Sequence, residues 1–256
     1  MRRAMRKVLR PLRRFERGAP RWPAIEELSK TAPFGAWARQ RVLVIFAHPD
    51  DEAFCSGLVA TLVEAKAEVR FLCMTRGEGG EAAGMDQEEI GAVRERELQD
   101  AAEILGVTAV SYLGYVDPAA ARSKPLAPVH DVNELTVRIR QAVLAYGATV
   151  VVTHGSGGEY WHPAHVCLHD CVKRVAASTP AALLTMNAWN PEHPLAGILN
   201  QDDLPSYRVD GGAVFQQRLR ALEAHGTQRG VFERFCGGTV ADFVRATEHE
   251  SYRLVT

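Results

Sequence analysis

One short block near the start of the chain combines the residue types that bind metals and move protons. The β-branched run Arg41–Phe46 (RVLVIF) is followed, after one alanine, by His48–Glu52 (HPDDE). Negative charge is favoured at a helix N-terminus, so capping of the next helix would explain some of these carboxylates. Capping does not explain His48, and three adjacent acids repel one another unless a cation relieves the repulsion. Because imidazole and carboxylate at positions i and i+3 of a tight turn suit Zn²⁺, we interpret this block as a metal site.

A second block of imidazoles lies more than a hundred residues further along the chain. The glycine-rich residues 154–159 (HGSGGE) lead to His162, Pro163 and His165. Proline favours the first turn of a helix, so a helix is expected to begin at Pro163. Two histidines three residues apart at a helix start are further candidates for a metal or catalytic site. His154, on the loop, is a weaker candidate.

The periodicity of the chain places both blocks at one edge of a sheet. From residue 41 onward, short apolar runs alternate with longer amphipathic stretches. This alternation implies right-handed βαβ crossovers and a mostly parallel sheet with helices on both faces, a three-layer α/β/α fold in a single domain. Ligands in such sheets bind beyond the carboxyl ends of the strands. We expect strands at 41–46, 68–74, 107–113, 148–153 and 182–186, and helices at 53–67, 88–105, 132–146, 163–177 and 214–225.

The composition fits a folded globular protein. Apolar residues make up 46% and charged residues 24% of the 256 residues, and the net charge is −1, so self-repulsion does not oppose collapse. No apolar run reaches the ~18 residues that a transmembrane helix needs. The five cysteines are an odd count without the tight spacing of a disulfide-stapled domain, which favours reduced thiols and a cytoplasmic location.

The near-zero net charge hides a basic N-terminal arm. Residues 1–22 contain nine Arg or Lys against one acid, so this segment carries +8 and the rest of the chain −9. We predict a basic arm over residues 1–40, either a solvated tail or a basic helix that makes peripheral contact with an anionic membrane through residues 1–22. No nucleic-acid partner is expected, because one short arm is not a basic face and the remaining domain is acidic. That domain, residues 41–256, carries a C-terminal elaboration from about residue 187, and the sequence leaves a homo-oligomer open.

Taken together, these motifs resemble the LmbE-like/PIG-L family of zinc-dependent N-deacetylases. The resemblance rests on the apolar strand with HPDDE at 48–52, T-R-G-E at 75–78, R-x-x-E-L-x-x-A-A-x-x-L-G-V at 94–107 and H-P-x-H at 162–165, and it covers residues 42–177. It implies a Rossmann-like domain that removes an acetyl or other acyl group from the amine of an N-acyl glucosamine-type substrate. The partner is then a small-molecule amino-sugar conjugate.

The resemblance also implies a role for each residue of the two blocks. His48, Asp51 and His165 would bind Zn²⁺, although Fe²⁺ or Co²⁺ suits the same N/O donors. Three protein ligands leave a fourth position for water, as in catalytic zinc sites. Asp50 would act as the general base, and His162 would stabilise the oxyanion or protonate the leaving amine.

Five further side chains are candidates for substrate contacts, each with a plainer alternative. The loop at residues 75–80 (TRGEGG) lacks the G-x-G-x-x-G spacing of a phosphate cradle, so its arginine would bind hydroxyl or anionic groups, or only pair with the nearby glutamate. An aspartate in G-Y-V-D-P would reach a sugar hydroxyl or only form a turn, and two aromatic rings would stack on a sugar or only pack. These candidates are Arg76, Glu78, Asp117, Tyr160 and Trp161. Arg94, on the following helix, is expected to hold the active-site loop rather than touch substrate.

One position departs from the family pattern. The family often has H-P-D-H, in which the acid orients the neighbouring imidazole, whereas this chain has Ala164. Either Asp170, Glu159 or Asp117 substitutes for the acid, or His162 works as a neutral donor with a lower pKa. Two alternatives to the sugar deacetylase remain at this stage: a deacylase of a non-sugar amide, and a non-catalytic Rossmann-like module that binds a metal or nucleotide.

Overall fold

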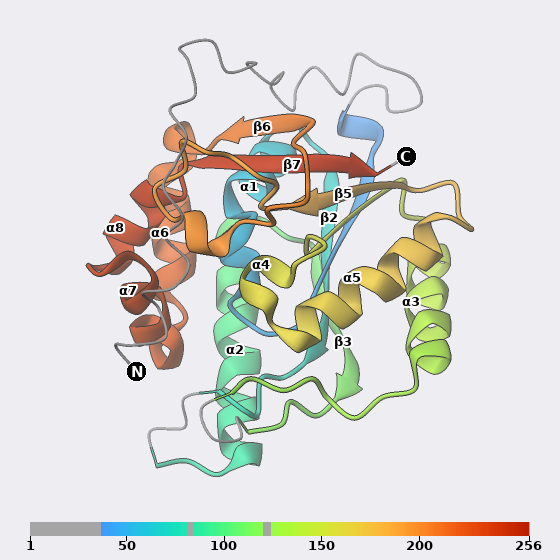
Figure 1. Cartoon of the computed structure of the whole chain (residues 1–256), viewed down its shortest axis with the longest axis horizontal. Helices are drawn as coiled ribbons and strands as arrows, with labels where there is room; N and C mark the ends of the chain where they lie inside the picture. Colours follow the sequence, from blue (N-terminus) through green and yellow to red (C-terminus); the bar gives the residue numbers. More distant parts are fainter. Residues whose placement is uncertain (1–36, 81–83, 120–123, 256) are drawn as a thin grey trace.

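A seven-stranded sheet carries the whole structure. The computed structural model describes residues 37–80, 84–119 and 124–255, and Figure 1 shows helices on both sides of the sheet. The strand order is β3-β2-β1-β4-β5-β7-β6, with the first five strands parallel and β7 antiparallel to both β5 and β6. The strands are β1 (Arg41–Phe46), β2 (Glu68–Thr75), β3 (Ala109–Tyr115), β4 (Val150–Thr153), β5 (Ala182–Met186), β6 (Tyr207–Asp210) and β7 (His249–Val255).

The central strand explains why the sheet is covered on both faces. Successive side chains of a strand point to opposite faces, so Val42, Val44 and Phe46 of β1 enter one apolar cluster, while Leu43 and Ile45 enter the other. A strand buried on both sides is apolar throughout, which is why β1 lacks polar alternation. The five parallel strands confirm the predicted α/β sheet, with ends within two residues of the expected ones.

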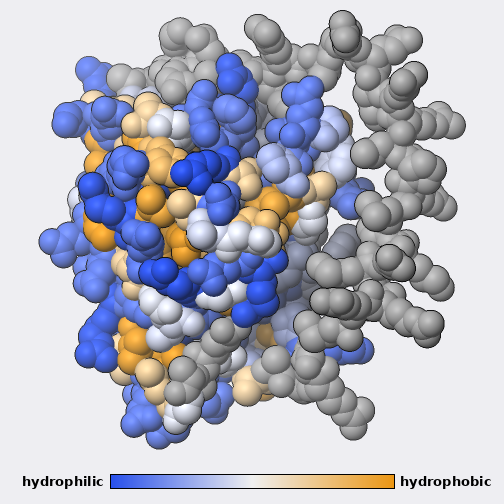
Figure 2. Space-filling view, turned by 90° about the vertical axis from the view of Figure 1, so that its left-hand side faces the viewer, coloured by the Kyte–Doolittle hydropathy of each residue, from blue (hydrophilic) through white to orange (hydrophobic). Residues whose placement is uncertain are grey.

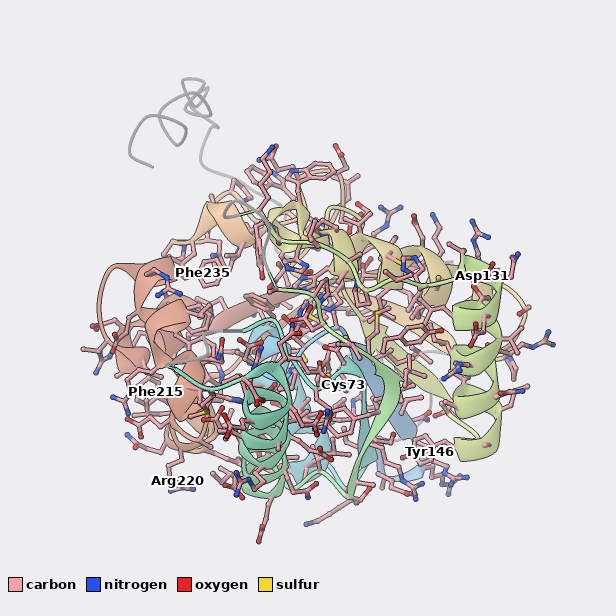
Figure 3. The ribbon with its side chains drawn as sticks, turned by 90° about the horizontal axis from the view of Figure 1, so that it is seen from below. Cys73, Asp131, Tyr146, Phe215, Arg220 and Phe235 are labelled. Atoms are coloured by element: carbon pink, nitrogen blue, oxygen red, sulfur yellow. The ribbon has the colours of Figure 1, made fainter. Side chains whose placement is uncertain are left out.

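The helices divide between the two faces. In Figure 3, Cys73 of β2 lies between the side that carries Phe215 and the side that carries Tyr146. One cluster packs α1 (Ser56–Glu64), α2 (Gln87–Leu105), α6 (Phe215–Glu223), α7 (Arg229–Cys236) and α8 (Val240–Ala246) against the sheet, and the other packs α3 (Val132–Tyr146) and α5 (Pro163–Ala176). Within the described ranges no helix combines the length and the apolar character that crossing a bilayer requires.

The helix expected at 53–67 is shorter than predicted. The chain forms the 3₁₀ helix η4 (Asp51–Phe54) first, and α1 then begins at Ser56 and ends at Glu64. The break falls at Cys55, whose φ of −137° and ψ of 17° are not helical, and the turn before η4 is made by Asp50, whose φ is 110°. The acidic block therefore lies on a tight turn and a separate helical turn.

The segment after residue 187 is more than a surface addition. It supplies β6 and β7, which extend the sheet beyond β5, and the helices α6–α8, whose apolar side chains Ala221, Leu222 and Phe243 are buried against the core. The outward face over these helices carries mostly hydrophilic residues with separate hydrophobic patches among them (Figure 2). The basic residues 1–22 of the predicted arm lie outside the described residues.

Candidate active site and metal centre

The acidic block forms a closed turn at the carboxyl end of β1. The backbone N–H of His48 donates to Asp51 Oδ2 at 2.8 Å, so the aspartate side chain folds back over the turn. Asp50 occupies the N-cap position of η4, yet its side chain makes no capping hydrogen bond. Helix capping therefore does not account for the Asp50 carboxylate. The Asp51 carboxylate instead closes the turn by accepting from His48.

Three predicted ligands from distant parts of the chain meet beside this turn. His48 Nδ1 lies 3.3 Å from Asp51 Oδ2 and 3.3 Å from His165 Nε2, and His165 Nε2 lies 3.2 Å from Asp51 Oδ1. A tetrahedral metal with donors at about 2.0–2.1 Å separates neighbouring donors by about 3.3–3.4 Å. The two distances to Asp51 end on different oxygens, so the cluster offers two imidazole nitrogens and one carboxylate that lie close enough to hold one divalent cation.

The topology explains why these residues meet. β1 and β4 are neighbours, and the strand order reverses between them, because β2 follows on one side of β1 and β4 lies on the other. Loops leaving the carboxyl ends of two strands at such a switch point form the ligand crevice of open α/β sheets. The 48–52 turn follows β1, and the segment leading to His165 follows β4.

Each of the two imidazoles has a carboxylate behind it. His165 Nδ1 lies 2.8 Å from Glu159 Oε2, and His48 Nε2 lies 3.4 Å from Asp117 Oδ1. Metal-binding histidines ordinarily have their second nitrogen fixed by a carboxylate or a carbonyl, which sets the tautomer and the ring orientation. Both histidines are thus placed as metal ligands normally are.

The electrostatics of the cluster favour a positive charge at the point where the donors meet. Burial alone would lower the pKa of His48, but Asp117 and Asp51 outweigh it and raise the pKa to about 9. Burial alone would raise the pKa of Asp51, but His165, His154 and His48 hold it well below its usual value. A divalent cation at that point would supply the positive charge that the carboxylates otherwise draw from protonated imidazoles.

Two other groups of donor atoms overlap with this one. His48, His162 and His165 offer nitrogens within 4.8 Å of one another, as do Asp51, His154 and His165 with their donor atoms. His154, which the sequence ranked as a weaker candidate, stacks its ring on His165 with centroids 3.8 Å apart. Its Nε2 accepts a hydrogen bond from the backbone N–H of Ala47 at 3.1 Å, so the lone pair on that nitrogen is already engaged.

Asp50 lies beside the donors and is held by an arginine. Its Oδ1 is 3.2 Å from Nη2 of Arg94, which also donates to Pro49 O and, through Nη1, to Gly77 O at 2.9 Å. Burial raises the pKa of Asp50 to about 6, since it outweighs the opposing effect of Arg94. Arg94 is only 3% exposed, so it holds the loops together, as predicted, instead of lying on a solvated face.

His162 has no carboxylate partner. Its buried Nδ1 has no hydrogen-bond partner among the described residues. Burial, followed by the nearby His48 and His165, lowers the pKa of His162 to about 3. Of the acids proposed to replace the one missing at Ala164, Glu159 faces His165, Asp117 faces His48, and Asp170 is exposed. The geometry favours the second alternative, a neutral imidazole.

The candidates on the 75–80 loop are engaged with protein partners. Arg76 pairs with Glu78 at 3.2 Å and with Glu88 at 2.7 Å, and Glu78 accepts a hydrogen bond from the backbone N–H of Asp117 at 3.0 Å. This chain of contacts fixes the position of Asp117 beside His48. Direct contact of Arg76 and Glu78 with substrate remains a prediction.

The two aromatic candidates differ in exposure. The Tyr160 ring packs 5.3 Å from Phe235 and 5.8 Å from His162, measured between ring centroids, so it lines the site from the protein side. Trp161 is 72% exposed and lies next to His162 with a φ of 64°. An exposed tryptophan beside the donors is free to pack against a ligand.

Sequence reasoning missed the buried partners that the C-terminal segment supplies. His225, between α6 and α7, makes a close contact with Glu52 Oε1, and Glu52 Oε2 accepts from the backbone N–H of Asp50 at 3.0 Å. Asn200 Oδ1 accepts from the backbone N–H groups of Gly157 at 2.9 Å and Glu159 at 3.0 Å. The contacts of His225 and of Asn200 have no local signal in the sequence, because these residues are more than 40 positions away from their partners.

Comparisons with known proteins find relatives of this chain in both sequence and fold. A chain from Geodermatophilus obscurus, 1D-myo-inositol 2-acetamido-2-deoxy-alpha-D-glucopyranoside deacetylase, is 29% identical over 84% of this chain and 92% of its own length. The N,N'-diacetylchitobiose deacetylase from Pyrococcus horikoshii superposes with a TM-score of 0.62 at 18% identity, covering 90% of this chain and 89% of that one. The 4-carboxy-2-hydroxymuconate hydratase of Pseudomonas putida superposes equally well, with a TM-score of 0.64 at 15% identity, covering 85% of this chain and 96% of the other. The two solved structures therefore show the fold, and a shared fold does not by itself fix the reaction.

The family assignment rests on the sequence match. The family described as PIG-L: GlcNAc-PI de-N-acetylase matches residues 43–176, just over half of the chain, and this range includes both histidine blocks. The resemblance read from the HPDDE and H-P-x-H motifs is therefore confirmed. The chain belongs to the PIG-L (LmbE-like) de-N-acetylase family.

Proposed function

We propose that the protein is a metal-dependent hydrolase that removes an acetyl group from the amine of an N-acetylglucosamine-type substrate. One observation carries the proposal: His48 Nδ1 and His165 Nε2 lie 3.3 Å apart and each lies 3.2–3.3 Å from one oxygen of Asp51, with the carboxylate of Asp50 beside them. Membership of a de-N-acetylase family and the deacetylase relatives support the same reaction. Zinc is the proposed ion because it prefers four N/O donors, and Fe²⁺ or Co²⁺ suits the same set.

The roles follow from the chemistry of amide hydrolysis. A divalent cation bound by the three donors would polarise the amide carbonyl and make water a better nucleophile. Asp50 is held by Arg94, and its side chain makes no helix-capping hydrogen bond. Its carboxylate takes the proton from the attacking water. The same carboxyl group then returns a proton to the amine, because an amide nitrogen leaves poorly as an anion. The products are a free amine and a carboxylate.

His162 is proposed to assist as a hydrogen-bond donor. A pKa lowered to about 3 keeps its imidazole neutral throughout the neutral range, so it donates an N–H without carrying a full charge. Donors aimed at the oxygen that becomes negative in the transition state contribute strongly in a site shielded from water. His162 therefore stabilises the oxyanion, and Asp50 protonates the leaving amine.

The substrate is proposed to be a glucosamine conjugate with a variable aglycone. Trp161, exposed at the site, offers a flat apolar face for a sugar ring, and Asp117 is positioned to accept from a hydroxyl group. The relatives act on an inositol conjugate in one case and on diacetylchitobiose in another, by their descriptions, so the aglycone differs within the family. A cytoplasmic location rests on five cysteines that are all free. Membrane contact through residues 1–22 and a homo-oligomer remain predictions.

A metal and product assay tests the proposal. Protein purified without chelator and without an affinity tag of histidines is expected to contain about one divalent ion per chain, by elemental analysis. It is then incubated with N-acetylglucosaminides that differ in aglycone, and acetate release is measured. A metal-loaded protein that releases acetate from none of these sugars but cleaves a non-sugar amide would overturn the sugar assignment. A protein that binds no divalent ion would overturn the proposed mechanism.

A further inference from the structure

Glu159 is the most heavily engaged carboxylate near the site. It is fully buried, and its Oε2 lies 2.8 Å from Nδ1 of His154 and 2.8 Å from Nδ1 of His165. Its Oε1 accepts from the backbone N–H of Gly155 at 3.1 Å and from Asn200 Nδ2 at 3.3 Å. One carboxylate thus touches two stacked imidazoles, only one of which belongs to the predicted ligand set.

An unusual backbone brings Glu159 to this place. Its φ of 61° and ψ of −66° lie outside the helical region, although it falls within the short α4 (Gly158–Trp161). Such a conformation costs of the order of 1–3 kcal/mol and persists only where its surroundings hold it. Here Asn200 Oδ1 accepts from the backbone N–H of Glu159, and Gly158 leaves room for His165, since a Cβ on that glycine would lie 2.9 Å from His165 Cβ.

The hydrogen bonds fix the tautomer of both imidazoles. The N–H of Ala47 donates to His154 Nε2, so that nitrogen carries a lone pair and His154 Nδ1 carries the proton that is donated to Glu159. An ionised carboxylate only accepts, so His165 Nδ1 must also carry a proton. The remaining nitrogen of His165, Nε2, then directs its lone pair towards Asp51 and His48.

We propose that Glu159 is a positioning residue that makes His165 a metal ligand and keeps the stacked His154 out of the ligand set. It presents the Nε2 lone pair of His165 to the metal centre, and it locks His154 in the tautomer whose Nε2 is consumed by Ala47. Asp51, His154 and His165 also lie close enough together to form a donor group, so a His154 whose Nε2 lone pair were free would bind alongside His165. The inference rests on the proposed function, because it assumes that the donor cluster holds a divalent ion.

The test replaces the carboxylate with a group of the same shape. In Glu159→Gln, one of the two oxygens becomes an NH₂ donor, so either the two Nδ1–H groups or the donors Gly155 N–H and Asn200 Nδ2 must face another donor. The matched control is Glu250→Gln, because Glu250 is also a buried carboxylate and accepts from the backbone N–H groups of Gly57 at 2.7 Å and Leu58 at 2.9 Å, with none of the donor imidazoles among its hydrogen-bond partners.

Zn²⁺ affinity of the apoprotein, measured by competition with a chromogenic chelator, is the first readout. Loss of a hydrogen-bond partner behind a metal ligand typically weakens affinity by about 10–100-fold, so Glu159→Gln is expected to fall in that range and Glu250→Gln to stay within about threefold of wild type. ¹⁵N shifts of labelled histidines in the Zn²⁺ form are the second readout. They are expected to show Nδ1–H on His165 in wild type and a changed tautomer population in the variant.

A second variant keeps the inference testable if Glu159→Gln folds poorly. His154→Gln leaves Glu159 on His165 and offers an amide oxygen to Ala47, so Zn²⁺ affinity is expected to stay within a few-fold of wild type. A drop of the size caused by losing a ligand would overturn the inference, because it would make His154 a ligand. So would a Glu159→Gln protein whose affinity matches that of Glu250→Gln. Wild type that binds no Zn²⁺ would instead refute the proposed function itself.

Discussion

His165 and His162 lie three residues apart at the start of α5, yet their surroundings are opposite. His165 is fully buried, and its Nδ1 rests on Glu159; burial alone would lower its pKa, but Asp51 and the hydrogen bonds raise it. His162 has no partner for Nδ1 among the described residues, and burial lowers its pKa to about 3. A carboxylate is what separates the two. The histidine with a partner is fitted to hold a cation, and the one beside Ala164 is fitted to donate a hydrogen bond as a neutral ring.

Removal of the partnered histidine is expected to have the largest effect. His165→Ala deletes one of three donors, so the protein should lose its metal and its activity together. Lewis-acid assistance is worth several kcal/mol, so the loss of kcat/KM should be at least about 10³-fold, or about 4 kcal/mol. Elemental analysis and acetate release measure the two effects on the same sample. A variant that keeps a full equivalent of metal would contradict the proposed contrast between the two histidines, since His165 would then not be a ligand.

Asp50→Asn tests the proposed general base, whose role is separate from those of His162 and His165. The amide keeps the shape of the side chain but cannot take a proton from water, so kcat is expected to fall by about 10²–10⁴-fold while the metal content stays unchanged. Arg94, which pairs with Asp50, should keep its backbone contacts to Gly77 and Pro49. Loss of metal along with activity would instead place Asp50 among the ligands.

The pH profile of the wild-type protein gives an independent measure of the same group. Asp50 must be ionised to act as a base, and burial raises its pKa to about 6. The value of kcat/KM is therefore expected to fall as the pH drops below about 6, by close to tenfold per pH unit. A bound cation favours the ionised carboxylate and so lowers this pKa, which places the acid limb at or below about pH 6. An acid limb well above pH 7 would exclude Asp50 as its source.

His162→Ala removes the unpartnered histidine, and its effect is expected to be smaller than that of His165→Ala. Loss of one donor to an oxyanion typically costs about 10²–10³-fold in kcat. The metal content should be unaffected, because the three proposed ligands remain. Parallel metal and kinetic measurements on the two alanine variants separate the two roles. Equal loss of metal in both would show that the histidines share one role and that the contrast is wrong.

The parts of this site that the sequence could predict are those with a local signature. Apolar runs predict the strands, and the carboxyl ends of parallel strands share one edge of a sheet, which is why the 48–52 and 162–165 blocks could be expected at the same edge. The choice of His48, Asp51 and His165 as ligands came from the family resemblance. The partners behind them could not be expected. Glu159 reaches His165 only through a left-handed backbone that Asn200 stabilises from outside the local segment.

The C-terminal segment also supplies partners that local sequence could not predict, over longer separations along the chain. β7 pairs antiparallel with β5 and so breaks the alternation on which the prediction of a parallel sheet rests. Its Glu250 accepts from the first backbone N–H groups of α1, and His225 contacts Glu52, and both pairings join residues more than 150 positions apart. Periodicity within a window of the sequence carries no information about such distant pairs.

Restoring the acid at position 164 should reduce the contrast between the two histidines. Ala164→Asp places a carboxylate within two residues of His162, and a partnered imidazole has a pKa higher by about 1–3 units than an unpartnered one. The pKa of His162 is expected to rise, as measured by NMR titration of its ring protons. The position is fully buried, so some loss of thermal stability is also expected. Ala164→Ser, which adds no charge, is the control for size.

The smallest effect is expected for the exposed aromatic side chain of the site, Trp161. Trp161 is 72% exposed, so Trp161→Ala removes little packing and should leave thermal stability and metal content unchanged. If the indole stacks on the sugar, its loss costs about 0.5–1.5 kcal/mol of binding, which is about a 2- to 12-fold rise in KM with kcat nearly constant. Leu204→Ala is the matched control, because Leu204 is 74% exposed and is likewise apolar. An unchanged KM in the tryptophan variant would confine substrate recognition to the buried groups around His48 and His162, and the exposed ring would then have no part in it.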